Sequence, residues 1–162
     1  MQTHAASDDR LADAFDALTD LYGDVTPLSA SEKVAQLLAR LIPSEHCSVA
    51  LYDIDADALR FVASAGENAA RRSAIELWNE GVVASAAIEN RFVRLDDCAI
   101  GLAPSDVPPG VAPSTMLLAP ISTGDRLRGV IQLVNARSAP TFCDADASLL
   151  QYVATRLGAR LG

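Results

Sequence analysis

Three aspartates at alternate positions, Asp53, Asp55 and Asp57, give the sequence a group of side chains that could coordinate calcium. An EF-hand loop beginning at Asp53 would need glycine at its sixth position and a bidentate glutamate at its twelfth. Ala58 and Ser64 stand there instead. The run is therefore predicted to be a solvated hairpin turn whose aspartates accept hydrogen bonds from the local backbone, and no metal site is expected.

A histidine directly before a cysteine, His46-Cys47, is the second arrangement that could do chemistry, because an imidazole can activate a thiol as a nucleophile. The surrounding residues predict a strand, in which neighbouring side chains point to opposite faces. The two groups therefore cannot form a dyad with each other. The other histidine, His4, lies in a segment, residues 1–7, that is predicted to be a flexible N-terminus. A structural role is favoured for Cys47.

The remaining cysteines, Cys98 and Cys143, bring the total to three, an odd number without close spacing. Such a set is typical of reduced thiols, so a cytoplasmic location is expected. The sequence has neither a glycine-rich phosphate loop nor a cluster of metal ligands. These residues do not predict an enzyme, and no cofactor is expected.

The bulk composition narrows the class of partner. A chain of 162 residues is expected to form one domain with its own core. Its net charge of −8 argues against nucleic acid and against anionic membrane surfaces. Residues 1–10 carry no apolar segment of the kind found in secretory signals.

The elements that must position any site begin with two amphipathic helices. The first is predicted to start at Ser7-Asp8-Asp9 and to end at Gly23. The second follows Pro27 and stops at Pro43. The apolar stripes of both helices follow helical spacing: Leu11, Ala14, Phe15, Leu18, Leu21 and Tyr22 in the first, and Val34, Leu37, Leu38, Leu41 and Ile42 in the second.

Most of the rest reads as strands joined by hairpins. Strands are predicted over residues 47–52, 59–63, 92–95, 115–121 and 126–135, with a proline-rich loop at 101–113 and a closing helix from Asp144. Within 67–90, two helical pieces hinged at Gly81 are predicted. Strands joined mainly by hairpins, with helices gathered on the faces, give an α+β fold with an antiparallel sheet.

A series of small motifs from Thr115 onward resembles the GAF domain family, a group of small sensory modules related to PAS domains. Members commonly show a hydroxyl residue, a proline followed by an aliphatic residue, a glycine turn, a Gly-Val strand ending on asparagine, and a closing Phe-x-x-x-Asp. The matching positions are Thr115, Pro120-Ile121, Gly124, Gly129-Val130, Asn135, Phe142 and Asp146. The resemblance covers roughly residues 30–160.

The resemblance implies a GAF-like sheet with the N- and C-terminal helices on one face and a lid and pocket on the other, within a single domain over residues 8–162. With the strand alternation it predicts which side chains face the pocket. These candidate ligand-binding residues are Ser48, Ala50, Tyr52, Met116, Leu118, Gln132 and Val134. The residues predicted to pack against the helices are Leu117, Ala119, Ile131 and Leu133.

The sole tryptophan, Trp78, completes the set of candidate ligand contacts. It lies near helical spacing with Ile75 and Val82, which favours a core position. Its expected place over the sheet keeps a ligand contact open as the alternative.

Two departures from the family argue against its best-known ligand. Members that bind cyclic nucleotides carry Asn-Lys, Phe and Asp-Glu in this region, whereas Ala136 and Ala147 replace the lysine and the glutamate. Arg137 is the neighbouring cation that could substitute for the lysine opposite Asp146.

The same comparison argues against two kinds of chemistry known in the family, methionine sulfoxide reduction and bilin attachment. The free methionine-R-sulfoxide reductases use acidic residues at the positions held here by Met116, Gln132 and Val134, and Cys98 has no evident resolving partner. Bilin-binding members often follow the lid cysteine with histidine, where this chain has Ala99.

Two functions therefore remain open. The first is a non-enzymatic sensory module, in bacterial signal transduction, that binds a small ligand over its sheet and signals through its terminal helices. The second is a scaffold with a collapsed pocket that works through protein contacts, as a homodimer through the terminal helices or with a partner signalling domain. The sequence fits both a free-standing protein and the input piece of a longer one.

Overall fold

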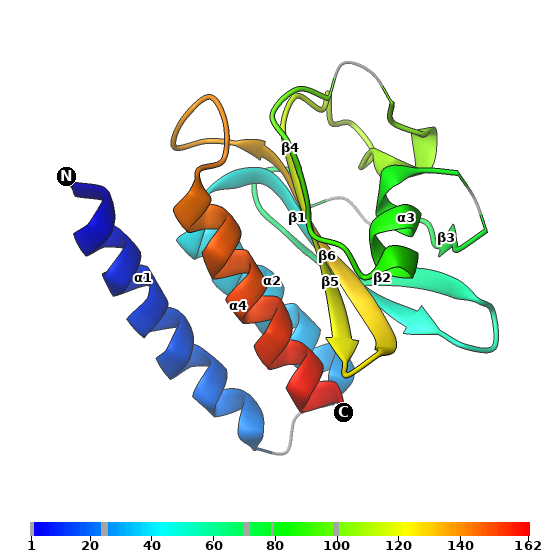
Figure 1. Cartoon of the computed structure of the whole chain (residues 1–162), viewed down its shortest axis with the longest axis horizontal. Coiled ribbons are helices and arrows are strands. Elements are labelled where there is room, and N and C mark those ends of the chain that lie inside the picture. The colour runs from blue at the N-terminus through cyan, green and yellow to red at the C-terminus, as the bar shows by residue number, and fades with distance from the viewer. Residues whose placement is uncertain (1, 24–25, 70–71, 79, 99–100) are drawn as a thin grey trace.

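The computed structural model describes residues 2–23, 26–69, 72–78, 80–98 and 101–162, with the backbone alone for residues 2–8 and 22. The side chains of His4, Ser7, Asp8 and Tyr22, and Ala99 as a whole, lie outside the described parts. Within these ranges the α+β class is confirmed (Figure 1).

Six strands form one antiparallel sheet in the order β3-β2-β1-β6-β5-β4. The two long hairpins follow from the turn residues between apolar runs, and they place β1 and β6 side by side at the centre. The strands are β1 (Ser44–Asp53), β2 (Ala58–Ala65), β3 (Ile75–Glu76), β4 (Val93–Leu95), β5 (Met116–Thr123) and β6 (Arg126–Ala136).

Helices cover both faces of this sheet (Figure 1). One face, called the helix face, carries α2 and α4, and α1 packs mainly on those two helices. The other, called the lid face, carries α3 and the short helix η2. The helices are α1 (Gln2–Thr19), η1 (Asp20–Tyr22), α2 (Pro27–Leu41), α3 (Val82–Glu89), η2 (Pro104–Asp106) and α4 (Asp144–Leu161).

Side chains on alternate strand positions divide into two cores, as the register predicted. Leu117 and Leu133 lie in the core of the helix face, and their chain neighbours Leu118 and Val134 lie in the core of the lid face. The other helix-facing positions, Ala119 and Ile131, are also in the helix-face core. The predicted assignment of faces is confirmed for these residues.

Of the two helical pieces predicted within residues 67–90, the second is confirmed as α3 (Val82–Glu89), and the first is wrong. Ile75 pairs with Leu59 in the β2–β3 ladder, so the first piece is a two-residue edge strand. Gly81 is the N-cap of α3 and not a hinge between helices. The sheet edge offered Ile75 a buried ladder position, which outweighed its weak helical spacing.

The start predicted for the first helix is also wrong. The backbone of α1 is helical from Gln2, six residues before Asp8 where the first turn was expected. The division between residues 1–7 and the domain at 8–162 remains a prediction. The strands match their predicted positions to within a few residues, β1 beginning at Ser44 where residue 47 was expected.

Asn135 shows why β6 ends on an asparagine. Its backbone has a positive φ of 64°, a conformation that asparagine tolerates. Its Oδ1 accepts from the backbone N–H groups of Ser114 (2.6 Å) and Thr115 (3.2 Å). Its Nδ2 donates to Glu45 Oε1 (3.0 Å) and to the Ala112 carbonyl (2.9 Å). One side chain therefore ties together the segment before β5, the end of β6 and the start of β1.

Candidate functional site

Three polar side chains lie fully buried on the lid face of the central strands. Ser48 on β1 stands opposite Gln132 on β6 in the ladder, and His46 lies two residues before Ser48, hence on the same face. All three have 0% of their surface exposed. Polar groups in such positions need hydrogen-bond partners, so their partners define the site.

His46, Ser48 and Gln132 are called the polar row below. Arg72 reaches them from the segment between β2 and β3. Its guanidinium lies 4.0 Å from the centre of the Phe61 ring, and only 7% of its surface is exposed. It donates through Nη1 to Gln132 Oε1 and through Nη2 to the Ser105 carbonyl at 2.7 Å. Gln132 Nε2 in turn donates to the carbonyl of Asp106 at 2.8 Å. Arg72 and Gln132 together tie η2 to the sheet.

The carboxylate of Asp106 holds α3 in place. It is fully buried and accepts from the N–H groups of Val82 (3.0 Å) and Val83 (3.1 Å) at the first turn of α3. It also accepts from the N–H of Ala103 at 2.8 Å. A carboxylate at a helix N-terminus satisfies otherwise unpaired donors and complements the helix dipole. Gly81, just before α3, leaves room for it, because a Cβ there would lie 2.8 Å from Asp106 Oδ1.

The charge of Arg72 lacks a direct counterion among the described residues. Its two acceptors, an amide oxygen and a backbone carbonyl, are both neutral, and the ion pairs of the described chain do not include it. Burial lowers the pKa of Arg72 to about 10, and the negative charge of Asp106 raises it in part. The guanidinium therefore remains protonated at neutral pH.

Two atoms in this row have no hydrogen-bond partner among the described residues: His46 Nε2 and Ser48 Oγ. His46 Nδ1 lies 2.7 Å from the carbonyl of Asn68. A carbonyl only accepts, so Nδ1 carries the proton. Burial lowers the pKa of His46, which keeps the ring neutral and leaves Nε2 as an acceptor. An unsatisfied buried polar group costs about 1–3 kcal/mol, so a polar group that pairs with His46 Nε2 or Ser48 Oγ would be favoured.

A groove of about 480 Å³ opens beside Arg72 along the outer edge of β2. This edge is free beyond Leu59 because β3 pairs only with Ala58 and Leu59. Ser64, which lines the groove, pairs with Ser48 across the β1–β2 ladder. The lining residues are Leu28, Arg60, Phe61, Val62, Ala63, Ser64, Ala69, Arg72 and Ala74. Arg72 connects this groove with the polar row, because it lines the groove and donates a hydrogen bond to Gln132; His46, Ser48 and Gln132 are not among the lining residues.

The sequence model of the GAF domain matches residues 26–161. The chain belongs to the GAF domain family. None of the curated proteins compared matches it in sequence. GAF domains are generally sensory or regulatory modules.

Solved structures agree on the fold. The chain is similar to the GAF domain of a phosphoenolpyruvate-protein phosphotransferase from Acinetobacter, with 19% identity, a TM-score of 0.78, and coverage of 94% of this chain and 90% of that one. The corresponding GAF domain from Coxiella burnetii has 16% identity, a TM-score of 0.78, and coverage of 96% and 94%.

An enzyme is also among the similar structures. The free methionine-R-sulfoxide reductase of Neisseria meningitidis, solved with its substrate, has 18% identity, a TM-score of 0.75, and coverage of 91% of this chain and 84% of that one. At these sequence identities the structural similarity establishes the GAF fold and does not indicate the activity of the chain.

The predicted site residues of this GAF domain have three different surroundings. Gln132 and Ser48 lie together in the polar row. Four apolar residues are completely buried in the lid-face core beneath α3: Ala50, Met116, Leu118 and Val134. Tyr52 packs against that core, but its hydroxyl donates to Asp57 Oδ1 at 2.9 Å in the exposed β1–β2 turn.

The favoured core position for Trp78 is wrong, because 72% of its surface is exposed. Its side chain is turned outward, whereas Ile75 and Leu77, which precede it in the chain, are buried. Trp78 borders a shallow surface pocket with Leu77 and Ile88. As a ligand contact it stays a prediction.

Sequence reasoning missed Arg72, His46 as a lid-face group, and Asp106. Arg72 lies sixty residues from Gln132 in the chain, so no local pattern links them. The signal for His46 was available: Ser48 was predicted to face the pocket, and the same alternation places His46 on that face.

In this GAF domain the ion-pair partners of Arg137 and Asp146 differ from those expected from the family motif. Arg137 does not substitute for the missing lysine, since it pairs with Glu67 (2.9 Å) and Glu45 (3.1 Å) at the surface. Asp146 instead pairs with Arg10 at 2.7 Å and caps α4 by accepting from the Cys143 N–H. The cation that pairs with Asp146 thus comes from α1.

The aspartate run after β1 is the hairpin turn that was predicted. Asp53 Oδ1 accepts from the backbone N–H groups of Asp55 (3.0 Å) and Ala56 (3.3 Å), and its Oδ2 accepts from Arg60 at 2.7 Å. Within the described ranges no group of three or more histidine, cysteine, aspartate or glutamate side chains is placed to hold a metal ion. Nor does any described helix combine the length and apolarity needed to cross a bilayer.

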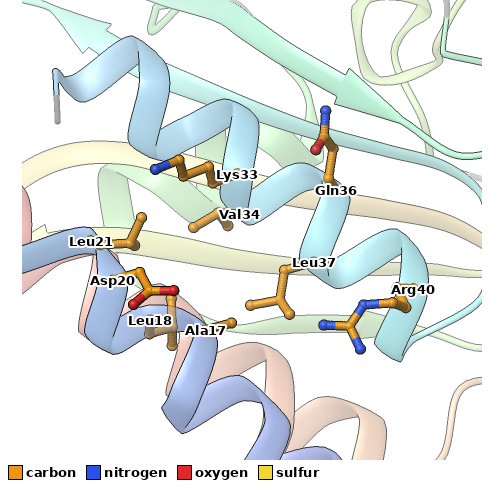
Figure 2. A pocket seen from close by; sticks show the side chains of 9 residues that line it. All are labelled: Ala17, Leu18, Asp20, Leu21, Lys33, Val34, Gln36, Leu37 and Arg40. Atoms are coloured by element: carbon orange, nitrogen blue, oxygen red, sulfur yellow. The ribbon is translucent and has the colours of Figure 1, made fainter.

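A second groove lies on the other side of the domain, between α1 and α2, and encloses about 460 Å³. Figure 2 shows Leu37 and Arg40 of α2 directed toward α1, with Leu18 of α1 and Leu21 of η1 on the facing side. Its floor is apolar and its rim is charged, with Asp20, Lys33 and Arg40 exposed. Its lining residues come from α1, η1 and α2 and include no residue of the polar row.

The thiols of this GAF domain are expected to differ sharply in reactivity. Cys47 is completely buried in the helix-face core, and burial raises its pKa to about 12. At pH 8 roughly one such thiol in 10,000 is ionised. Cys143 is exposed at the start of α4. Iodoacetamide at pH 8 should therefore modify Cys143 at least tenfold faster than Cys47 in the folded protein, as measured by peptide mass spectrometry. Equal rates in the folded protein would contradict the buried position of Cys47.

Proposed function

We propose that this chain is a non-enzymatic regulatory GAF domain that binds a small ligand on the lid face of its sheet and signals through its terminal helices. The observation that carries the proposal is a pair of buried polar atoms, His46 Nε2 and Ser48 Oγ, that have no hydrogen-bond partner among the described residues. A domain evolved only for packing would gain stability by replacing them with apolar groups. Arg72 lines the groove and donates a hydrogen bond to Gln132, the ladder neighbour of Ser48, and in this proposal the ligand enters through this groove.

Signalling through the helices follows from the arrangement of layers. The polar row lies on β1 and β6, whose opposite faces pack against α2 and α4. A change in the lid attachments made by Arg72 and Gln132 would shift the central strands, and with them the helices that a neighbouring domain contacts. As part of this proposal, we place the domain in the cytoplasm of a bacterium, since several GAF domains of similar structure come from bacterial proteins, among them the DevS GAF domain from Mycobacterium smegmatis.

Serine-to-alanine substitutions at two buried positions test whether the polar row serves ligand binding and not the stability of the fold. Ser31 and Ser48 are both fully buried, but only Ser31 has a partner, the Pro27 carbonyl at 2.8 Å. Without ligand, Ser48→Ala should leave the free energy of unfolding unchanged or raise it by about 1 kcal/mol, while Ser31→Ala should lower it by about 1 kcal/mol. Urea denaturation measures both values.

The same variants are then screened by thermal unfolding against nucleotides, amino acids, sugars and organic acids. We expect one class to raise the melting temperature of the wild type and of Ser31→Ala, and to have a much smaller effect on Ser48→Ala. If no compound stabilises the wild type, the ligand-binding function is wrong.

A scaffold function is the second candidate, and exposed apolar residues on α1 favour it. Leu11 and Phe15 are 45% and 54% exposed, and with Tyr152 of α4 they line an open groove of about 710 Å³. An apolar patch of this kind is typical of helix-to-helix contacts between copies. The occupant proposed here is a second copy of this chain.

Light scattering over a concentration series tests this interface. We expect a dimer that Phe15→Ser shifts toward monomer by at least tenfold in dissociation constant. Ile88→Ser is the matched control, because Ile88 is 58% exposed on α3, away from the terminal helices, and it should leave the equilibrium unchanged. A wild-type monomer at all concentrations would rule the homodimer out.

A further inference from the structure

Arg72 brings an uncompensated positive charge to the lid face. A buried ion is costly unless it is paired, yet both acceptors of Arg72 are neutral groups. Its guanidinium is a planar fork suited to two parallel hydrogen bonds with a carboxylate. The charge therefore calls for an anionic partner that the described side chains do not supply.

The groove beside Arg72 has the matching electrostatics. The whole chain carries a net charge of −8, but the nine residues that line this groove include Arg60 and Arg72 and no acid. Arg60 is already neutralised by Asp53 at 2.7 Å. One positive charge remains, which fits a ligand with a single negative charge better than a dianionic phosphate.

His46 specifies a second feature of the ligand. Its Nε2 is an acceptor, because Nδ1 donates to the Asn68 carbonyl. A carboxylate cannot satisfy it, so the ligand must also carry a donor. An ammonium group would face no acid in the groove lining and would be repelled by Arg72, whose charge acts on His46. A hydroxyl group is the donor that fits.

The spacing limits the size of the ligand. His46 and Ser48 are two residues apart on one strand face, which corresponds to roughly 6.6 Å. Ser48 stands opposite Gln132, the amide that Arg72 contacts. A chain of about four carbons spans such a row, with Ser48 Oγ able to donate or accept beside it.

We propose that the ligand of this site is a small hydroxy monocarboxylic acid, bound with its carboxylate on Arg72 and its hydroxyl group on His46. This inference rests on the function proposed above. Because Arg72 also holds η2 through the Ser105 carbonyl, a carboxylate on Arg72 competes with that contact. Ligand binding then loosens one of the two ties between η2 and the sheet.

Titration calorimetry on the wild-type protein tests the ligand class with matched compounds. The probes are 2-, 3- and 4-hydroxybutyrate, butyrate, the amide of each hydroxy acid, and inorganic phosphate. We expect at least one hydroxybutyrate to bind at least tenfold more tightly than butyrate, which lacks the hydroxyl group. It should also bind at least tenfold more tightly than its own amide, which lacks the charge.

Variants then assign the two contacts. Arg72→Gln should weaken the hydroxy acid at least tenfold, while Arg60→Gln, at the surface of the same groove, should change its affinity less than threefold. His46→Phe should bring hydroxybutyrate and butyrate to equal affinity. If Arg72→Gln does not fold, the acid-to-amide comparison on the wild type still decides the role of the charge.

The outcomes separate this inference from the function on which it rests. Equal binding of acid and amide, equal binding of butyrate and hydroxybutyrate, or binding of phosphate alone would overturn the hydroxy acid. So would a failure of every hydroxy acid while another compound class stabilises the protein in the wider screen, and the ligand-binding function would then stand. If nothing binds in either experiment, both fall.

Discussion

Asp106→Ala is expected to lower the free energy of unfolding by about 3 kcal/mol. The substitution removes the cap of α3 and leaves the N–H groups of Val82, Val83 and Ala103 without their acceptor. Two of these three contacts are only part-buried, so each lost bond is counted at about 1 kcal/mol, the low end of the cost of an unpaired buried donor. It also removes the negative charge that acts on Arg72. Urea denaturation followed by circular dichroism gives the value.

Two further variants show whether the cap is the cause. Asp106→Asn keeps one acceptor oxygen, so its loss should be smaller, about 2 kcal/mol. Asp125→Ala removes an exposed acid from the β5–β6 turn and should change stability by less than about 0.5 kcal/mol. In Asp106→Ala, hydrogen exchange should accelerate first at the amides of Val82 and Val83. A loss below 1 kcal/mol would mean that α3 holds its place without this carboxylate.

The two faces of the sheet could be predicted because strand alternation is a local rule. Leu117 and Leu118 are chain neighbours, yet they enter different cores, and one residue of slip would have exchanged them. The same rule placed Ser48 and Gln132 on one face. The closing Asn135, Phe142 and Asp146 motif could be recognised because its spacing is fixed by one hairpin and one helix start.

The lid could not be predicted because its contacts are distant in sequence. Helical spacing near Ile75 competed with a two-residue ladder to Leu59, and so short a strand leaves no periodic signal. The cap of α3 comes from Asp106, twenty-four residues beyond Val82. The structural role of Arg72 depends on its contact with Gln132, which is distant in the sequence. These are tertiary effects that override local preference.

The predicted pocket lining also needs a different chemical description. Four of its apolar members, Ala50, Met116, Leu118 and Val134, are closed beneath α3. What lines the groove is a cation with neutral partners, Arg72, while the imidazole of His46 is fully buried. Electrostatics, and not apolar area, therefore determines what this site can select.

Asn135→Ala is expected to lower the free energy of unfolding by about 4 kcal/mol. The change removes four hydrogen bonds, among them the acceptor for the buried Thr115 N–H. Leaving buried groups unpaired accounts for about 3 kcal/mol. The positive φ of 64° adds about 1 kcal/mol, because alanine tolerates it less well than asparagine does. Urea denaturation measures the total.

Asn135→Gly separates the two causes. Glycine accepts the positive φ without strain but makes none of the side-chain bonds, so its loss should be about 3 kcal/mol and should lie below that of alanine. Asp57→Gly is the matched backbone control: Asp57 also has a positive φ, of 48°, but lies in the exposed turn, where its carboxylate accepts one bond from Tyr52. It should cost less than about 1 kcal/mol. If Asn135→Gly is as stable as the wild type, Asn135 serves its backbone conformation alone, and the ties from β6 to Ser114, Thr115 and Glu45 contribute nothing to the stability of the sheet.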